Sequence, residues 1–212
     1  MARTKSAAAH QKVLEAALKL FAERGIDATS MDAIAEASGV SKATIYKHWR
    51  DKDTLCLEVL VYLHGLDEEQ PVFDSGDIRA DLIAQLNYQP AEHRRKMKER
   101  IMPHLIAYSA RNQVFGRQWR ERVLERSRTQ LKEILKRGEE QGELVKSINT
   151  DIAVALLLGP MVYRHIFMKR FGGKIPADLA THVVDAFLAA YRAGPFGFAQ
   201  GRRPSGRASH RT

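Results

Sequence analysis

The sequence predicts an all-α protein of about nine helices, and three observations support this fold class. Apolar residues recur at intervals of three and four, which places them on one face of a helix. Residues 1–25 show this pattern most clearly, with Val13, Leu14, Ala17, Leu18 and Phe21. No stretch alternates apolar and polar residues with β-branched enrichment, so we expect no strands. Glycine and proline residues fall between the periodic segments, where helices end.

The expected helices follow one another along the whole chain. The first ends at Gly25, and Ser30 and Asp51 stand at positions that favour the start of a later helix. After the first helix, the others are expected at about 30–39, 41–48, 51–66, 77–89, 92–109, 112–140, 150–170 and 177–192. The segment DEEQPVFDSG at 67–76 is the clearest linker.

This order of segments divides the chain into an N-terminal and a larger C-terminal part. We expect an N-terminal domain at 1–50 with an arm at 1–7, a connecting helix at 51–66, a helical domain at 67–194 and a disordered tail at 195–212. The tail is rich in glycine, arginine and serine and has no apolar helical stripe, so it offers little surface to bury.

Composition excludes several classes of protein. The chain has 212 residues, a net charge of +9 and one cysteine, so it has no internal disulfide framework and no cysteine-rich zinc site. Its eight histidines lack the spacing of metal sites, and we expect no metal or cofactor. The basic N-terminus is not followed by a signal-peptide core, and the most apolar run, at 152–168, contains Arg164 and His165. We therefore expect a cytoplasmic protein with no membrane partner.

Residues 30–50, SMDAIAEASGVSKATIYKHWR, have the anatomy of a helix-turn-helix. Two short helices that cross steeply need a small residue where their backbones touch, and Ala35 meets that need. Gly39 suits a turn that requires a positive φ. Ile34, Val40 and Ile45 supply an apolar wedge on both sides of the turn. The alternative is a plain helical hairpin with a solvated polar face.

Three segments resemble the N-terminal DNA-binding domain of the TetR family. They are FAERG at 21–25, TSMDAIAEASGVSKATIYKHW at 29–49 and DKDTL at 51–55. A weaker similarity spans the rest of the chain, through RGEEQGEL at 137–144 and LLLGPMVYR at 156–164. The resemblance implies a DNA-binding domain followed by a regulatory and dimerisation domain. Trp49 departs from the family's more usual phenylalanine, and we interpret it as a core residue between two helices.

The resemblance also implies roles for individual residues. Lys42, Ala43 and Thr44 would face bases in the major groove, while the hydroxyl of Ser30, or of Thr29, would meet a phosphate. The full set of expected DNA contacts is Thr29, Ser30, Ser41, Lys42, Ala43, Thr44, Tyr46, Lys47, His48 and Lys52. The arm, with Arg3 and Lys5, either reaches a minor groove or neighbouring phosphates, or is a solvated terminus; both interpretations stay open.

The C-terminal part is expected to form a homodimer and to hold a small-molecule effector of unknown identity. Its candidate effector-binding residues are Met97, Ile101, His104, Leu105, Phe115, Trp119, Tyr163 and Phe167, although each alone is also an ordinary core residue. The stretch 92–137 has fourteen basic and five acidic residues. It either attracts an anionic effector or strengthens the field near DNA, or it is a solvated helix face.

Together these observations predict a ligand-responsive transcriptional regulator, a repressor that binds a palindromic operator in double-stranded DNA as a dimer and leaves it when an effector binds. The alternative is a DNA-binding protein whose C-terminal domain binds a protein partner or only dimerises. No catalytic motif supports an enzyme, since the chain lacks a G-x-S-x-G segment, a phosphate-binding glycine loop and paired carboxylates in an apolar setting.

Overall fold

The computed structural model describes residues 2–164, 167, 172–174 and 176–193, with the side chains of 2–6 and 127 left aside. The α-helices are α1 (Ala2–Arg24), α2 (Met31–Ser38), α3 (Lys42–His48), α4 (Lys52–Leu63), α5 (Ile78–Asn87), α6 (Glu92–Arg111), α7 (Gln113–Trp119), α8 (Glu125–Glu140), α9 (Thr150–Tyr163) and α10 (Leu179–Tyr191). The described part contains no strand, only an isolated bridge between Leu144 and Arg192. The predicted all-α fold class is confirmed.

The helix expected at 112–140 is divided into three consecutive parts. A short π-helical segment, η1 (Arg120–Leu124), separates α7 from α8. This division explains why the structure has one more α-helix than the expected nine. A single π-helical turn inside a longer helix is a rare feature that the helical periodicity of the sequence does not indicate.

Side chains that cap helices define several of the boundaries. The hydroxyl of Ser30 accepts a hydrogen bond from the backbone of α2, the hydroxyl of Ser41 from that of α3, and the carboxylate of Asp51 from that of α4. Asp77 and Asn149 cap α5 and α9 in the same way. Each cap satisfies a backbone N–H that would otherwise lack an acceptor in the first helical turn.

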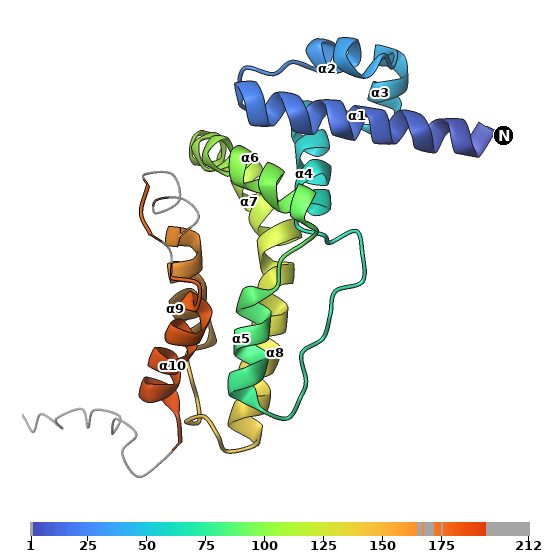
Figure 1. Cartoon of the computed structure of the whole chain (residues 1–212). Helices are drawn as coiled ribbons and strands as arrows, with labels where there is room; N and C mark the ends of the chain where they lie inside the picture. The colour runs from blue at the N-terminus through green and yellow to red at the C-terminus, as the bar shows by residue number, and fades with distance from the viewer. Residues whose placement is uncertain (1, 165–166, 168–171, 175, 194–212) are drawn as a thin grey trace, which may run out of the picture.

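The molecule has two hydrophobic cores. The first joins α1, α2, α3 and α4 to α6 and α7, and the second joins α5, α8, α9 and α10. Figure 1 shows α1, α2 and α3 grouped at one end, with α4 leading away from them toward α6 and α7. In the same view α5 and α8 lie side by side, with α9 and α10 beyond them. Because α6 and α7 belong to the first core, the end formed by α1, α2 and α3 and part of the C-terminal domain pack as one unit.

The linker at 67–76 follows an irregular path that a buried carboxylate fixes. Asp81 accepts hydrogen bonds from the backbone and the hydroxyl of Ser75 and from the Arg137 guanidinium, which also donates to the Phe73 carbonyl. Burial alone would raise the pKa of Asp81, but the bonds from Ser75 and Arg137 outweigh it and keep the pKa below its usual value. The linker is therefore tied to both α5 and α8.

The two ends of the chain and its single cysteine complete the description of the fold. Residues 2–7, expected as an arm, form the first turns of α1, whereas the tail at 195–212 lies outside the described residues. Cys56 is fully buried, and burial raises the pKa of its thiol far above its usual range. None of the described helices is both long and apolar enough to cross a bilayer.

Candidate DNA interface and effector region

The crossing of α2 and α3 has the geometry that the motif requires. Ile34, Ala35 and Ile45 are buried between the two helices, and Gly39 ends α2 with a φ of 65°. Val40 is partly buried against the same core. A left-handed residue at this position turns the chain sharply enough for α3 to leave α2 at a steep angle. The helix-turn-helix anatomy read from the spacing is therefore present in the fold.

The outer face of α3 carries the side chains expected to read DNA. Lys42, Ala43, Tyr46, Lys47 and His48 are exposed, and Thr44 is half-buried. The Ser41 and Thr44 hydroxyls lie 2.9 Å apart, and Ser41 also accepts from the Thr44 backbone. The Lys42 ammonium pairs with Asp32 at 2.8 Å, with both side chains largely exposed. An exposed pair of this kind is weak enough for a phosphate or a base to displace.

The structure separates the two hydroxyls that were candidates for a phosphate contact. Thr29 is only 1% exposed, and its hydroxyl donates to the Gly25 carbonyl at 2.7 Å. Ser30 is exposed at the N-terminus of α2. Of the two, only Ser30 presents its hydroxyl to the surface.

Lys52 also has an internal role that the sequence did not indicate. Its ammonium donates to the Ile26 carbonyl at 2.6 Å and to the Asp27 carbonyl at 3.3 Å. These bonds tie the start of α4 to the loop that follows α1. A phosphate contact by Lys52 would have to share or replace them.

Trp49 fills the space between α1, α3 and α4 and is 1% exposed. Its indole Nε1 donates to Glu58 at 2.5 Å, and its ring stacks on His10 with centroids 4.6 Å apart. His10 Nε2 is 2.8 Å from the other carboxylate oxygen of Glu58. The expected core role of Trp49 thus includes two polar neighbours, His10 and Glu58, that the sequence analysis missed because they lie far apart along the chain.

Two family models match these two parts of the chain. The model described as "Bacterial regulatory proteins, tetR family" matches residues 13–59, and the model described as "Tetracyclin repressor-like, C-terminal domain" matches residues 72–187. The chain belongs to the TetR family. Like the other members, it is a DNA-binding transcriptional regulator of the helix-turn-helix type.

Individual relatives agree with this assignment. The chain is 30% identical over 162 residues to the uncharacterized HTH-type transcriptional regulator YdeS of Bacillus subtilis, covering 76% of this chain and 80% of YdeS. It is 38% identical over 81 residues to the DNA-binding transcriptional repressor TetR of Mycobacteroides abscessus, covering 38% of this chain and 40% of that protein. A TetR-family transcriptional regulator from Mesorhizobium loti has a similar structure, with a TM-score of 0.57, 27% identity and coverage of 88% and 98% of the two chains.

The residues expected to line the effector pocket of this TetR-family regulator do not gather around one cavity. Ile101, Leu105 and Phe115 are fully buried in the first core, where they pack against other side chains. Tyr163 and Phe167 stack on each other near the end of α9, 56% and 48% exposed. Met97, His104 and Trp119 are partly buried on α6 and α7.

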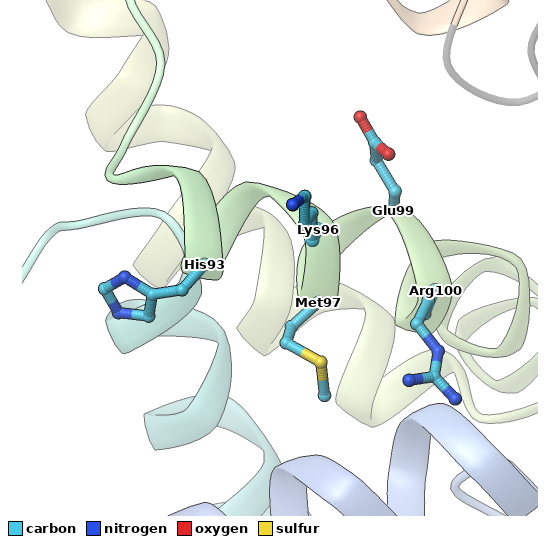
Figure 2. Close-up of a pocket in the computed structure, with 5 residues that line it drawn as sticks. All are labelled: His93, Lys96, Met97, Glu99 and Arg100. Carbon is cyan, nitrogen blue, oxygen red and sulfur yellow. The ribbon is translucent and has the colours of Figure 1, made fainter.

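A shallow hollow lies on the surface of α6. It has a volume of about 570 Å³ and is lined by His93, Lys96, Met97, Glu99 and Arg100 (Figure 2). Met97 is the one member of the expected pocket among these residues. Because the hollow is open and bordered by one helix face, its geometry differs from that of an enclosed effector pocket.

Residues at the C-terminal end of α6 bond directly to the DNA-binding end, which comprises α1, α2, α3 and the start of α4. The Tyr108 hydroxyl donates to Asp53 at 2.6 Å, and the Asn112 amide donates to the other oxygen of Asp53 at 3.0 Å. Arg111 pairs with Asp27 in the loop after α1. Burial and the Asp53 carboxylate raise the pKa of Tyr108 to about 12, so its phenol stays protonated and remains a donor.

A second contact between α6 and the DNA-binding end is steric. His104 packs on the backbone at Gly25, where an added Cβ would lie 3.0 Å from the imidazole Nδ1 and where φ is 87°. A larger residue at position 25 would therefore be both strained and crowded. His104, expected in an effector pocket, in this structure contacts the end of α1.

Proposed function

We propose that this TetR-family regulator is a homodimeric repressor that releases a palindromic operator when a small molecule binds its C-terminal domain. The observation that carries the proposal is the exposed polar face of α3 together with the hydrogen bonds that Tyr108 and Asn112 donate to Asp53. The first would be the surface that enters a major groove, and the second would transmit movement of the C-terminal helices to that surface. The name of the Mycobacteroides relative supports repression rather than activation.

The proposed DNA surface consists of the exposed or half-buried residues at the turn and on α3. These are Ser30, Ser41, Lys42, Ala43, Thr44, Tyr46, Lys47 and His48. Lys52 would contact a phosphate only if its ammonium gave up its hydrogen bonds to the Ile26 and Asp27 carbonyls. Thr29 is left out because its hydroxyl is buried. Lys42 and Thr44 would read base edges, and the hydroxyl of Ser30 would bind a phosphate beside the N-terminus of α2.

The proposed dimer surface lies on α9 and α10. Ile152, Leu156, Val162 and Tyr163 leave an exposed apolar stripe along α9. On α10, Ala186, Ala189 and Ala190 are exposed and small enough for close helix approach. Two copies of this surface would bury both stripes in a bundle of four helices, because a twofold interface brings the same patch of each subunit together.

Effector binding would act on the DNA-binding ends through α4 and α6. Since operator half-sites have a fixed spacing, a shift of a few ångströms between the two α3 helices weakens simultaneous docking. The required coupling is modest, about 1–3 kcal/mol for a change of about 5- to 150-fold in affinity.

The proposal is tested with a duplex selected from a randomised library by the purified protein. We expect a palindromic sequence, a complex with two protein chains by analytical ultracentrifugation, and a monomer after Leu156→Glu. A selected sequence without symmetry, or a Leu156→Glu protein that stays dimeric, would contradict the proposed assembly. Absence of any small-molecule effect on operator affinity would favour the alternative, a C-terminal domain that binds a protein partner or only dimerises.

A further inference from the structure

Helix α3 is short, and little of its own surface holds it in place. Between Lys42 and His48, all of which the structure describes, only Ile45 is buried. The helix packs mainly on α1 and α2 and much less on α4, to which it is joined through residues 49–51. A helix with one buried anchor can tilt about that anchor. The angle of α3 therefore depends on what holds Trp49, the residue that directly follows it.

Trp49 is held by one side chain from each of two other helices. Its indole Nε1 donates to Glu58 Oε2 on α4 at 2.5 Å. The other oxygen of that carboxylate, Oε1, is 2.8 Å from His10 Nε2 on α1, which donates because an ionised carboxylate only accepts. The His10 ring in turn stacks on the indole, with centroids 4.6 Å apart and planes inclined by 29°. Each of these three side chains, here called the Trp49 triangle, therefore contacts the other two.

The Trp49 triangle also supports a residue of the proposed DNA surface. The ring of His48, the last residue of α3, lies 5.5 Å from the indole and 5.7 Å from the His10 ring, measured between centroids. The His48 side chain is itself exposed. Because His48 and Trp49 are adjacent in the chain and their rings are in contact, a displaced indole would carry the last turn of α3 with it.

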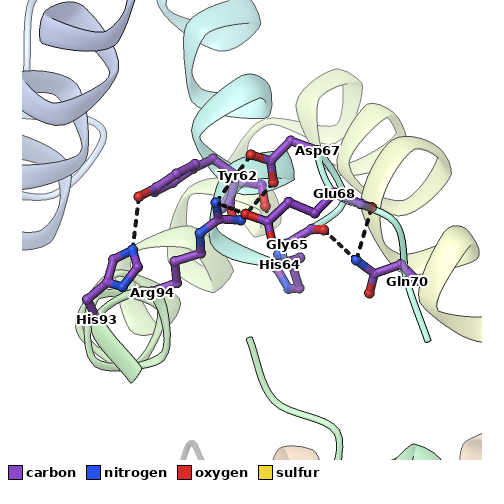
Figure 3. Close-up of polar contacts among 9 residues, drawn as sticks. Tyr62, His64, Gly65, Asp67, Glu68, Gln70, His93 and Arg94 are labelled. Atoms are coloured by element: carbon purple, nitrogen blue, oxygen red, sulfur yellow. Dashed lines mark hydrogen bonds and ion pairs between the residues drawn. The ribbon is translucent and has the colours of Figure 1, made fainter. Parts of the chain in front are cut away.

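The other end of α4 has a polar cluster that does not reach α3 (Figure 3). Arg94 of α6 is buried, donates to the Tyr62 carbonyl at 3.1 Å, and places its guanidinium over the Tyr62 ring at 4.0 Å. It also donates to Asp67 at 2.8 Å and to Glu68 at 2.6 Å. None of its described partners belongs to α1, α2 or α3. This cluster fixes α4 against α6 and offers a comparison in which α4 is loosened without a direct effect on α3.

We propose that Glu58 and His10 are positioning residues for DNA recognition. By holding Trp49 they fix the angle at which α3 presents Lys42 and Thr44 to the major groove. A helix at a wrong angle still meets phosphates, but its side chains no longer align with base edges, so the cost falls on sequence discrimination. The inference rests on the proposed function, because it assumes that α3 reads the operator.

The test compares Glu58→Ala with Glu58→Gln in the full-length protein, by fluorescence anisotropy on the selected operator and on a scrambled duplex of the same length. Both variants lose the same negative charge, which by itself would strengthen binding to any duplex. Only glutamine keeps an oxygen that can accept from the indole. We expect Glu58→Ala to lose about tenfold or more in operator affinity and little on the scrambled duplex, and Glu58→Gln to recover most of that loss.

Two further comparisons test whether Glu58 and His10 act through the indole. Trp49→Phe cannot donate to Glu58, so the double variant Trp49→Phe/Glu58→Ala should lose less operator affinity than the product of the two single losses. His10→Phe keeps a ring against the indole, whereas His10→Ala loses both the ring and the bond to Glu58. His10→Ala should therefore lose more discrimination than His10→Phe.

Arg94→Met is the matched control for stability. It removes the cluster at the other end of α4 and should lower the melting temperature, because several hydrogen bonds to a charged group are lost. Its discrimination between the operator and the scrambled duplex should equal that of the parent protein. Melting curves of all variants determine a temperature at which every one is folded, and binding is measured there.

Several outcomes would overturn the inference and leave the proposed function standing. These are equal losses on the operator and the scrambled duplex, a lower melting temperature without lost discrimination, and equal losses for Glu58→Ala and Glu58→Gln. A loss of discrimination in Arg94→Met as large as that in Glu58→Ala would also overturn it, since it would indicate a general effect of stability. Failure of the proposed function itself would appear separately, as a parent protein that selects no operator or a Lys42→Ala protein that binds the operator as the parent does.

Discussion

The DNA-binding end and the α4–α6 region use polar groups in opposite ways. In α2 and α3 the polar side chains either cap a helix a few residues away, as Ser30 and Ser41 do, or point to solvent. Between α4 and α6 they meet across long sequence separations, as Tyr108 and Asn112 meet Asp53. The capping contacts of the first region form within single helices, whereas the polar contacts of the second join different helices and are therefore sensitive to movement of whole helices.

The largest expected effect is the loss of stability on substitution of Trp49, which packs between α1, α3 and α4. Trp49→Ala removes a fully buried indole and should lower the free energy of unfolding by about 3–5 kcal/mol. Trp49→Phe keeps most of the ring but loses the bond to Glu58, so its loss should be smaller. Urea denaturation followed by circular dichroism measures both. Equal losses for the two variants would mean that the hydrogen bond, rather than the packing, determines the effect.

The outer face of α3 provides the next largest effect, this time on binding rather than stability. Lys42→Ala and Thr44→Ala should each reduce discrimination between operator variants by about 1–3 kcal/mol, because they remove contacts to base edges. Salt titrations on specific and scrambled duplexes measure this. Lys52→Ala, in contrast, should loosen the start of α4 and weaken binding to every duplex alike. A uniform loss for Lys42→Ala and Thr44→Ala would contradict the assigned reading face.

A third prediction concerns the hydrogen bonds that join the end of α6 to Asp53 on α4. Tyr108→Phe removes one bond to a carboxylate and should lower the free energy of unfolding by about 1–2 kcal/mol. It should also increase hydrogen exchange at the start of α4, since Asp53 loses one of its two partners. Tyr88→Phe is the matched control, because no hydrogen bond of that hydroxyl to a described residue is present. Equal exchange in the two variants would show that Asp53 does not need Tyr108.

The smallest expected effect is the pH dependence of stability due to His64. Burial and Lys98 lower the folded-state pKa of His64 to about 3, while the unfolded chain takes up a proton near its ordinary value of 6.5. Protonation therefore favours the unfolded state, and stability is lost as the pH falls below about 6.5. The loss should reach about 1 kcal/mol by pH 5.5.

The variant His64→Phe isolates this contribution from the other titrating groups. Its stability should fall less between pH 7 and 5.5 than that of the parent protein, whereas His182→Gln, on the exposed surface of α10, should behave like the parent. Parallel pH curves for the parent and His64→Phe would show that His64 is protonated as readily in the folded as in the unfolded chain.

Sequence patterns predicted the DNA-binding end better than the effector region, and particular residues show why. Ser30, Gly39 and Ser41 act within three residues of their own positions, so their roles follow from local chemistry. Thr29 stands next to Ser30 and is chemically similar, yet its hydroxyl turns inward to the Gly25 carbonyl. Ile101 and Phe115, candidates for the effector pocket with an ordinary core position as the alternative, are buried in the first core, because whether an apolar side chain meets a cavity or another side chain depends on its packing partner.

The sequence by itself determined the all-α fold, the caps of the short helices, the turn at Gly39 and the polar face of α3, because helical periodicity and capping act over a few residues. The tertiary structure alone decided that Lys52 is tied to the loop after α1, that α6 contacts the end of α1, and that Tyr108 and Asn112 donate hydrogen bonds to Asp53. These features join residues 25 to 84 positions apart. Their geometry depends on how the helices pack, which no local pattern specifies.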